Sequence, residues 1–80
     1  MTTITIENMA KEIFSFTLRE DIEIADLKET IALYFNVNQN RIVLYKDFIE
    51  CKDYFEVING SHFFVFINDM PYYTLCLNSS

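Results

Sequence analysis

The sequence predicts an α+β domain in which several short strands form a sheet and one helix covers one side of it. Three observations favour this class. Only residues 21–37 show a convincing helical period, several other stretches are strand-like, and the 80-residue chain has one Gly and one Pro to interrupt them. At 51% hydrophobic and 16% aromatic, the chain can build an efficient core despite its small size.

The first two stretches predict an antiparallel hairpin. Thr2 to Glu7 alternates, with Ile4 and Ile6 on one face and polar residues on the other. Residues 8–11 interrupt the pattern, and Glu12 to Leu18 then resumes it with two Phe and one Leu on one face. A four-residue connection between two half-buried strands is typical of a hairpin.

The third stretch predicts the helix, whose apolar stripe contains Ile24, Leu27, Ile31 and either Tyr34 or Phe35. Asp21 is the candidate N-cap, and Asn36 can take the left-handed conformation that ends many helices. The acidic residues near the helix start suit the positive end of the helix dipole. The alternative is that they form a patch for a basic partner.

The second half of the chain predicts three further strands. Arg41 to Tyr45 is a short β-rich run, and Phe48-Ile49 is a briefer one. The irregular stretch that follows carries three apolar residues expected to be buried, Tyr54, Phe55 and Val57. Asn59-Gly60 is a strong turn signal before Ser61 to Ile67, which is apolar on both faces and therefore belongs in the centre of a sheet.

Composition and charge exclude several function classes. The net charge of −6 disfavours nucleic acid and anionic membrane surfaces as partners. The longest apolar run, HFFVFI, is far too short to span a bilayer, and the N-terminal residues do not resemble a signal peptide. We therefore expect an intracellular protein, cytoplasmic or nuclear, that binds neither nucleic acid nor membrane.

Catalysis, metals and cofactors are not expected. Cys51 and Cys76 lack CxxC spacing, and His62 is the single histidine, so a structural metal site has too few ligands. Free thiols, buried or half-buried, are the expected state of both cysteines. A cysteine with His62 is the only nominal nucleophile and base, with no third group to orient them.

The order of these elements resembles the ubiquitin-like β-grasp family over about residues 3–67. The helix pattern Ile24-x-x-Leu27-x-x-x-Ile31 is similar, QNRIVL at residues 39–44 resembles ubiquitin's QQRLIF, Ile49-Glu50 resembles its LE, and SHFFVF at residues 61–66 replaces its STLHLV. The resemblance implies a mixed sheet of four to five strands with one helix packed across it, formed by residues 1–68. Residues 69–80 would add an extra C-terminal strand.

The resemblance also assigns a core. Its positions fall on residues that are all apolar here, namely Ile4, Ile6, Phe14, Phe16, Leu18, Ile24, Leu27, Ile31, Ile42, Ile49, Val57, Phe63, Val65 and Ile67. Lys28 matches a lysine that is largely buried and ion-paired in ubiquitin. Its usual aspartate partner falls on Cys51, so either Asp53 substitutes or Lys28 is exposed, and we expect exposure.

The partner-binding patch of ubiquitin matches Val43, Phe64 and Phe66, with His62 nearby as a surface or hydrogen-bonded residue. These residues would form an apolar surface on the sheet face away from the helix, where exposed patches usually mark interaction sites. Alternatively, the tail covers them. The chain ends in LCLNSS with no glycine after Gly60, so conjugation through a Gly-Gly end is not expected.

The tail YYTLCL is as strand-like as any earlier stretch, and its candidate self-association or patch-covering residues are Tyr72, Tyr73, Leu75 and Leu77. It would add to an edge strand, lie over the patch or pair with a second molecule. The sequence therefore predicts a non-catalytic ubiquitin-like module that binds a protein partner through an apolar sheet face. The alternatives are a self-associating structural subunit, which would form a homodimer through the C-terminal strand, or a domain fragment of a larger assembly.

Overall fold

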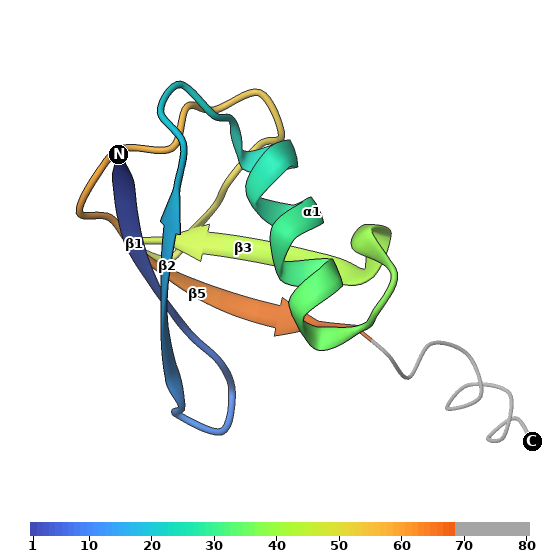
Figure 1. Ribbon diagram of the computed structural model, residues 1–80. Helices are drawn as coiled ribbons and strands as arrows, with labels where there is room; N and C mark the ends of the chain where they lie inside the picture. Colours follow the sequence, from blue (N-terminus) through green and yellow to red (C-terminus); the bar gives the residue numbers. More distant parts are fainter. Residues whose placement is uncertain (69–80) are drawn as a thin grey trace, which may run out of the picture.

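The computed structural model describes residues 1–68, and the expectations for residues 69–80, with Tyr72, Tyr73, Leu75, Cys76 and Leu77, lie outside them. The described chain contains five strands, one α-helix and one 3₁₀ turn (Figure 1). Their bounds are β1 (Thr2–Glu7), β2 (Ile13–Leu18), α1 (Ile24–Phe35), η1 (Gln39–Arg41), β3 (Ile42–Lys46), β4 (Ile49–Glu50) and β5 (His62–Ile67).

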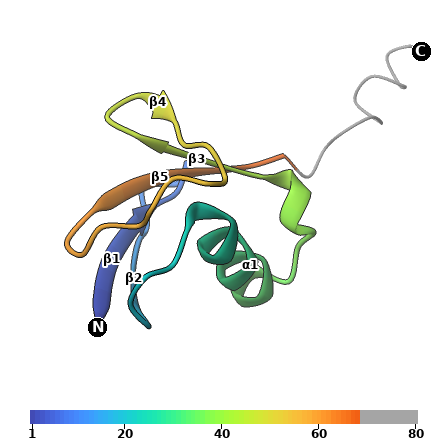
Figure 2. The ribbon, with the colours of Figure 1, turned by 90° about the horizontal axis from the view of Figure 1, so that it is seen from above.

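The five strands form one mixed sheet in the order β2-β1-β5-β3-β4. β1 and β5 run parallel, whereas the other neighbouring strands are antiparallel. β5 is the middle strand, as its apolar character on both faces predicts. α1 crosses one side of the sheet, as Figure 2 shows. The predicted α+β fold, with a four- to five-stranded mixed sheet and one helix across it, is confirmed.

The core lies between α1 and the sheet. Phe63 and Val65 on β5 are 2% and 1% exposed and face the helix side. Together with residues of β1, α1 and β3 they form one buried cluster, which contains Ile4, Ile6, Ile22, Ile24, Leu27, Ile31, Ala32, Ile42, Leu44, Cys51, Val57, Phe63 and Val65. Phe16, Leu18, Phe35 and Ile67 pack against it with part of their surface exposed. Most of the predicted core is therefore confirmed.

Three side chains predicted to be buried are exposed instead. Ile49 is 67%, Tyr54 71% and Phe55 40% exposed. β4 is a two-residue strand at the edge of the sheet, so within residues 1–68 no further strand lies beside Ile49. The carbonyls of Asp53 and Phe55 accept hydrogen bonds from the N–H groups of Ala25 and Ile24. The loop thus presents its backbone to the helix start, and its aromatic side chains stay outside.

Helix α1 begins two residues later than expected. Its N-cap is Glu23, not Asp21, and the Glu23 N–H donates to Asp26 Oδ2 at 3.0 Å. Asp21 instead takes a left-handed conformation in the preceding turn, with φ of 57°. Asn36 ends the helix as predicted, with φ of 58°, and its N–H donates to the carbonyl of Ala32. Both ends therefore satisfy helix groups that would otherwise lack partners.

Lys28 is not exposed as expected. Its Nζ donates to Asp53 Oδ1 at 2.8 Å, and its side chain is only 14% exposed. The reason is that the loop after β4 lies against the first turn of α1, which places Asp53 beside Lys28. The aspartate partner is thus supplied from a different loop position than the resemblance implied.

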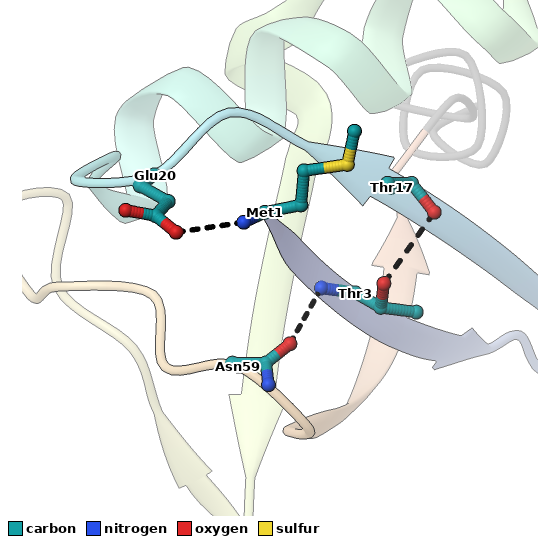
Figure 3. A network of polar contacts seen from close by, with 5 residues as sticks. All are labelled: Met1, Thr3, Thr17, Glu20 and Asn59. Atoms are coloured by element: carbon teal, nitrogen blue, oxygen red, sulfur yellow. Dashed lines mark hydrogen bonds and ion pairs between the residues drawn. The ribbon is translucent and has the colours of Figure 1, made fainter.

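Polar contacts hold the start of β1 to neighbouring segments of the chain (Figure 3). The Met1 amine lies 2.7 Å from Glu20 Oε2, and the Thr3 N–H donates to Asn59 Oδ1 at 2.8 Å. The Gly60 N–H in turn donates to the Thr3 carbonyl. Gly60 has φ of 88°, so the predicted Asn59-Gly60 turn needs its glycine. Among the residues described, no helix is long and apolar enough to cross a membrane.

Candidate interaction surface

The side of the sheet opposite α1, which we call the open face, carries alternate residues of β5. His62, Phe64 and Phe66 point to it because Phe63 and Val65 point to the core. The strand register places Val43 of β3 opposite Phe66 and Tyr45 opposite Phe64. The structure therefore brings Val43, Phe64, Phe66 and His62 onto one face, as the sequence predicts.

The apolar residues of the open face are only half covered. Phe64 is 40% and Phe66 37% exposed, and Val43 and Tyr45 are intermediate. On the other side of β5, the parallel strand β1 places Thr5 opposite His62 and Glu7 opposite Phe64. The apolar area therefore lies over β3 and β5 and gives way to polar residues over β1.

An open groove of about 560 Å³ hollows this face. We call it the open-face groove, and its lining residues are Glu7, Tyr45, Asp47, Phe48, His62 and Phe64. The volume lies within the range of small-molecule and side-chain pockets, about 300–1,000 Å³. Three aromatic rings, two carboxylates and one imidazole thus meet in one depression.

Phe48 has the most unusual position in this groove. It is 102% exposed at the tip of the β3–β4 hairpin, whose two central residues, Asp47 and Phe48, have φ of 55° and 67°. A two-residue hairpin turn of this kind favours Asn-Gly, and a bulky side chain in the left-handed region is strained. The hairpin therefore holds an aromatic ring in water at a local energetic cost.

His62 is held in place by two polar neighbours. Its Nδ1 lies 2.7 Å from Thr5 Oγ1, and its Nε2 lies 3.2 Å from Glu7 Oε1. The expectation that His62 is a hydrogen-bonded surface residue is confirmed. Glu7 is thereby fixed at the β1 side of the open-face groove.

Cys51 lies on the other side of the sheet from His62. Its thiol is free and buried in the core, as expected, and burial raises its pKa while nearby Lys46 and Lys28 oppose that rise. The nominal pair of Cys51 and His62 is not brought together. Within residues 1–68, no three His, Cys, Asp or Glu side chains are grouped as a metal site.

A second hollow, of about 480 Å³, lies beside the Lys28–Asp53 ion pair. It is lined mainly by polar residues of α1 and of the segment before β3, namely Lys28, Asn38, Gln39, Asn40, Ile42 and Asp53. The Gln39 amide there donates to the Ala25 carbonyl, so these side chains hold the segment against the helix. The polar contacts around this second hollow join the segment before β3 to α1, so we assign the hollow a structural role.

Solved structures identify the architecture. The N-terminal ubiquitin-like domain of the 4931431F19Rik protein superposes with a TM-score of 0.74 at 20% identity, over 82% of this chain and 73% of that one. A ubiquitin-like domain from Arabidopsis thaliana gives 0.71 at 21% identity, over 86% and 79%. This chain has the ubiquitin-like β-grasp fold. The order of the five strands and the helix along residues 1–68 is also the order that the sequence resemblance implies.

A third similar structure is ATBAG1 in complex with HSP70, with a TM-score of 0.75 and 11% identity. The match covers 99% of this ubiquitin-like chain but spans about half of the ATBAG1 chain, 47%. No family model matches the sequence. No curated protein matches it either.

Sequence reasoning missed four residues of this ubiquitin-like domain's groove, Glu7, Tyr45, Asp47 and Phe48. The sequence prediction placed Phe48 in the strand that follows Lys46-Asp47, which is wrong, because the structure places Asp47 and Phe48 in the turn and the strand at Ile49–Glu50. The signal for Tyr45 was its alternation with the buried Leu44. Glu7 carried none, because its proximity to Phe64 depends on the parallel register between β1 and β5.

Proposed function

We propose that this ubiquitin-like domain is a non-catalytic protein–protein interaction module that binds a protein partner through its open face. Val43, Phe64 and Phe66 would form the contact, with His62 at its margin. An intracellular location belongs to the same proposal, and the free buried thiol of Cys51 is consistent with a reducing compartment.

The observation that carries the proposal is the half-exposed aromatic row on β5. Monomeric proteins rarely leave contiguous apolar area exposed without a use, and aromatic residues are the usual anchors of interfaces. Phe64 and Phe66 are both more than a third exposed, although alternate positions of the same strand are almost fully buried. Polar residues at those two sites would cost little stability compared with the buried positions, so the aromatic side chains favour a binding role.

The similarity to ATBAG1, a protein solved in complex with HSP70, supports a binding role in a general way. At 11% identity the likeness concerns the fold, so the partner of this chain has to be sought through its own surface residues. Self-association remains the alternative, and the test below distinguishes it.

Site-specific photocrosslinking tests the proposal. We would replace Phe66 by the photoreactive p-benzoylphenylalanine in the full chain, express it in its native host and irradiate. The matched control carries the same group at Leu33, which is 78% exposed on α1. We expect a discrete adduct from position 66 that position 33 does not give and that Phe64→Thr abolishes.

The adduct's mass separates the hypotheses. An adduct with a different protein, dependent on Phe64, supports the interaction module. An adduct of twice the chain mass would make self-association the function of this face. Equal labelling from positions 66 and 33, or none from either, would contradict a binding role for the open face.

A further inference from the structure

We propose that the partner segment that fills the open-face groove is basic, with an apolar anchor flanked by Lys or Arg, and that Phe48 at the hairpin tip is its principal aromatic contact. This inference rests on the proposed function and specifies the chemistry of the partner. It is carried by the charges around the groove and by the strained position of Phe48.

The charges that surround the groove are one-sided. Glu7 and Asp47 line it, and Glu50 shares the open face because it pairs with Tyr45 in the β3–β4 register. No Lys or Arg is among the lining residues, and the only potential cation there is His62, which is occupied with Glu7. Lys46 is the nearest lysine along the chain, and it alternates to the other side of β3. The groove therefore presents carboxylates next to aromatic rings.

Charge complementarity disfavours the other two candidate occupants, a second copy and the chain's own tail. A second copy of this chain carries the same net charge of −6, and a symmetric contact would bring the acidic groove of one copy against that of the other. The chain's own tail, residues 69–80, contains Asp69 and no Lys or Arg. That segment offers apolar residues for the rings but no lysine or arginine for Glu7 and Asp47. A basic partner satisfies both the rings and the charges.

Phe48 supplies the second argument. Its ring is fully exposed while its backbone is in a conformation that glycine adopts without strain. Folding alone would favour glycine at this position, so the aromatic ring is present against the local backbone preference. Its place in the lining beside Tyr45 and Phe64 shows where a partner would use it. The rings hold an apolar anchor, and Glu7 and Asp47 select the residues that flank it.

Selection from a phage-displayed library of random 12-residue peptides tests this inference on the full chain. Peptides that bind wild type would be counter-selected against a Phe48→Gly/Phe64→Thr double variant, so that only binders of the groove remain. We expect the surviving sequences to be enriched in Lys and Arg around one or two large apolar residues.

A synthetic peptide from this set then measures the role of the carboxylates by fluorescence anisotropy at low salt. We expect Glu7→Gln/Asp47→Asn to raise Kd about five- to ten-fold, the sum of two exposed ion pairs in a groove. The matched control, Glu29→Gln, removes an exposed carboxylate of α1 and should change Kd less than about two-fold. Raising the salt concentration should weaken wild type more than the neutralised variant.

The outcomes distinguish this inference from the proposed function. Groove-dependent peptides that are acidic or uncharged would overturn the basic partner and leave the interaction module standing. Peptides that bind both wild type and the double variant, or none at all, would overturn both. A concentration-dependent dimer in sedimentation, lost in Phe64→Thr, would assign the groove to a second copy and also overturn the inference.

Discussion

The two faces of the sheet differ most clearly along β5, where one of two neighbouring phenylalanines is buried and the other is exposed. Phe63 is 2% exposed against α1, whereas Phe64 is 40% exposed on the open face. Both sides of the strand HFFVFI carry large apolar residues, so residue type does not separate Phe63 from Phe64. Strand alternation thus assigns side chains to faces, while the position of α1 decides which face becomes the core.

A second contrast lies within the open face itself. Over β1 and β2 its residues are mostly hydroxylic or charged, and Thr3 Oγ1 approaches Thr17 Oγ1 at 3.5 Å (Figure 3). Over β3 and β5 the same face is aromatic. Apart from the exposed Ile13 opposite Glu7, the β1–β2 half shows that a solvated sheet face can be built from polar residues. The predictions below test whether the aromatic half serves binding and the buried face serves stability.

The largest effect should follow truncation on the buried face. Phe63→Ala should lower the free energy of unfolding by about 3–5 kcal/mol, because it removes a buried ring and leaves a cavity. The total free energy of unfolding of a domain of this length is roughly 4–12 kcal/mol, so Phe63→Ala can unfold it. The milder Phe63→Leu is therefore the companion variant for quantitative urea denaturation. Phe64→Thr should cost only about 1 kcal/mol. Equal losses at the two positions would show that the open face is part of the structural core.

Phe48→Gly should change stability in the opposite direction. The left-handed backbone at this turn costs a non-glycine residue about 1 kcal/mol or more, so glycine should raise the free energy of unfolding by about 1 kcal/mol. Denaturation midpoints at constant m-value would report it. The same variant should lose binding of the selected peptides. A variant that loses both stability and binding would mean that the Phe48 ring packs as part of the fold.

Two polar contacts on opposite sides of the sheet, the Lys28–Asp53 ion pair and the His62–Glu7 contact, should differ in their contribution to stability. Lys28→Met should cost about 1 kcal/mol, since the 14% exposed side chain is packed beside Asp53, although the 65% exposure of Asp53 limits the Coulombic part. His62→Gln on the open face should cost less than about 0.5 kcal/mol. Urea denaturation at low and high salt would compare them. Equal costs would contradict the distinction between a structural and a solvated face.

The smallest effect should come from the surface contact of Glu20 at the sheet end. A hydrogen bond from the Met1 amine, and then its Coulombic attraction, lower the pKa of Glu20. Because the folded-state pKa is the lower one, the contribution is present above the unfolded pKa of about 4.3 and is lost as pH falls through the folded value. Wild type should therefore be only slightly more stable to urea than Glu20→Gln at neutral pH. The two denaturation curves should converge in acid. A difference that grows on acidification would be incompatible with this ion pair.

Local pattern determined most of the fold before any tertiary information. The period of residues 21–37 predicted α1, alternation predicted β1 and β2, and Asn59-Gly60 predicted the turn before β5. These features depend on contacts between near neighbours, which the order of residue types encodes directly. The patch residues Val43, Phe64 and Phe66 could also be assigned to one face, because their alternation fixes their side once the strands are paired.

Only the tertiary structure shows which residues distant in sequence lie next to each other. The parallel pairing of β1 with β5 brings Glu7 to Phe64 across 57 residues of chain, and the loop after β4 brings Asp53 to Lys28. The same loop gives its carbonyls to the start of α1 and so leaves Tyr54 and Phe55 outside, against their apolar character. Local sequence pattern was enough to predict where the helix and most strands lie and which side chains of a strand share a face. Which charges and rings meet on the open face was decided by strand order and loop docking, because these depend on contacts distant in sequence that no local pattern records.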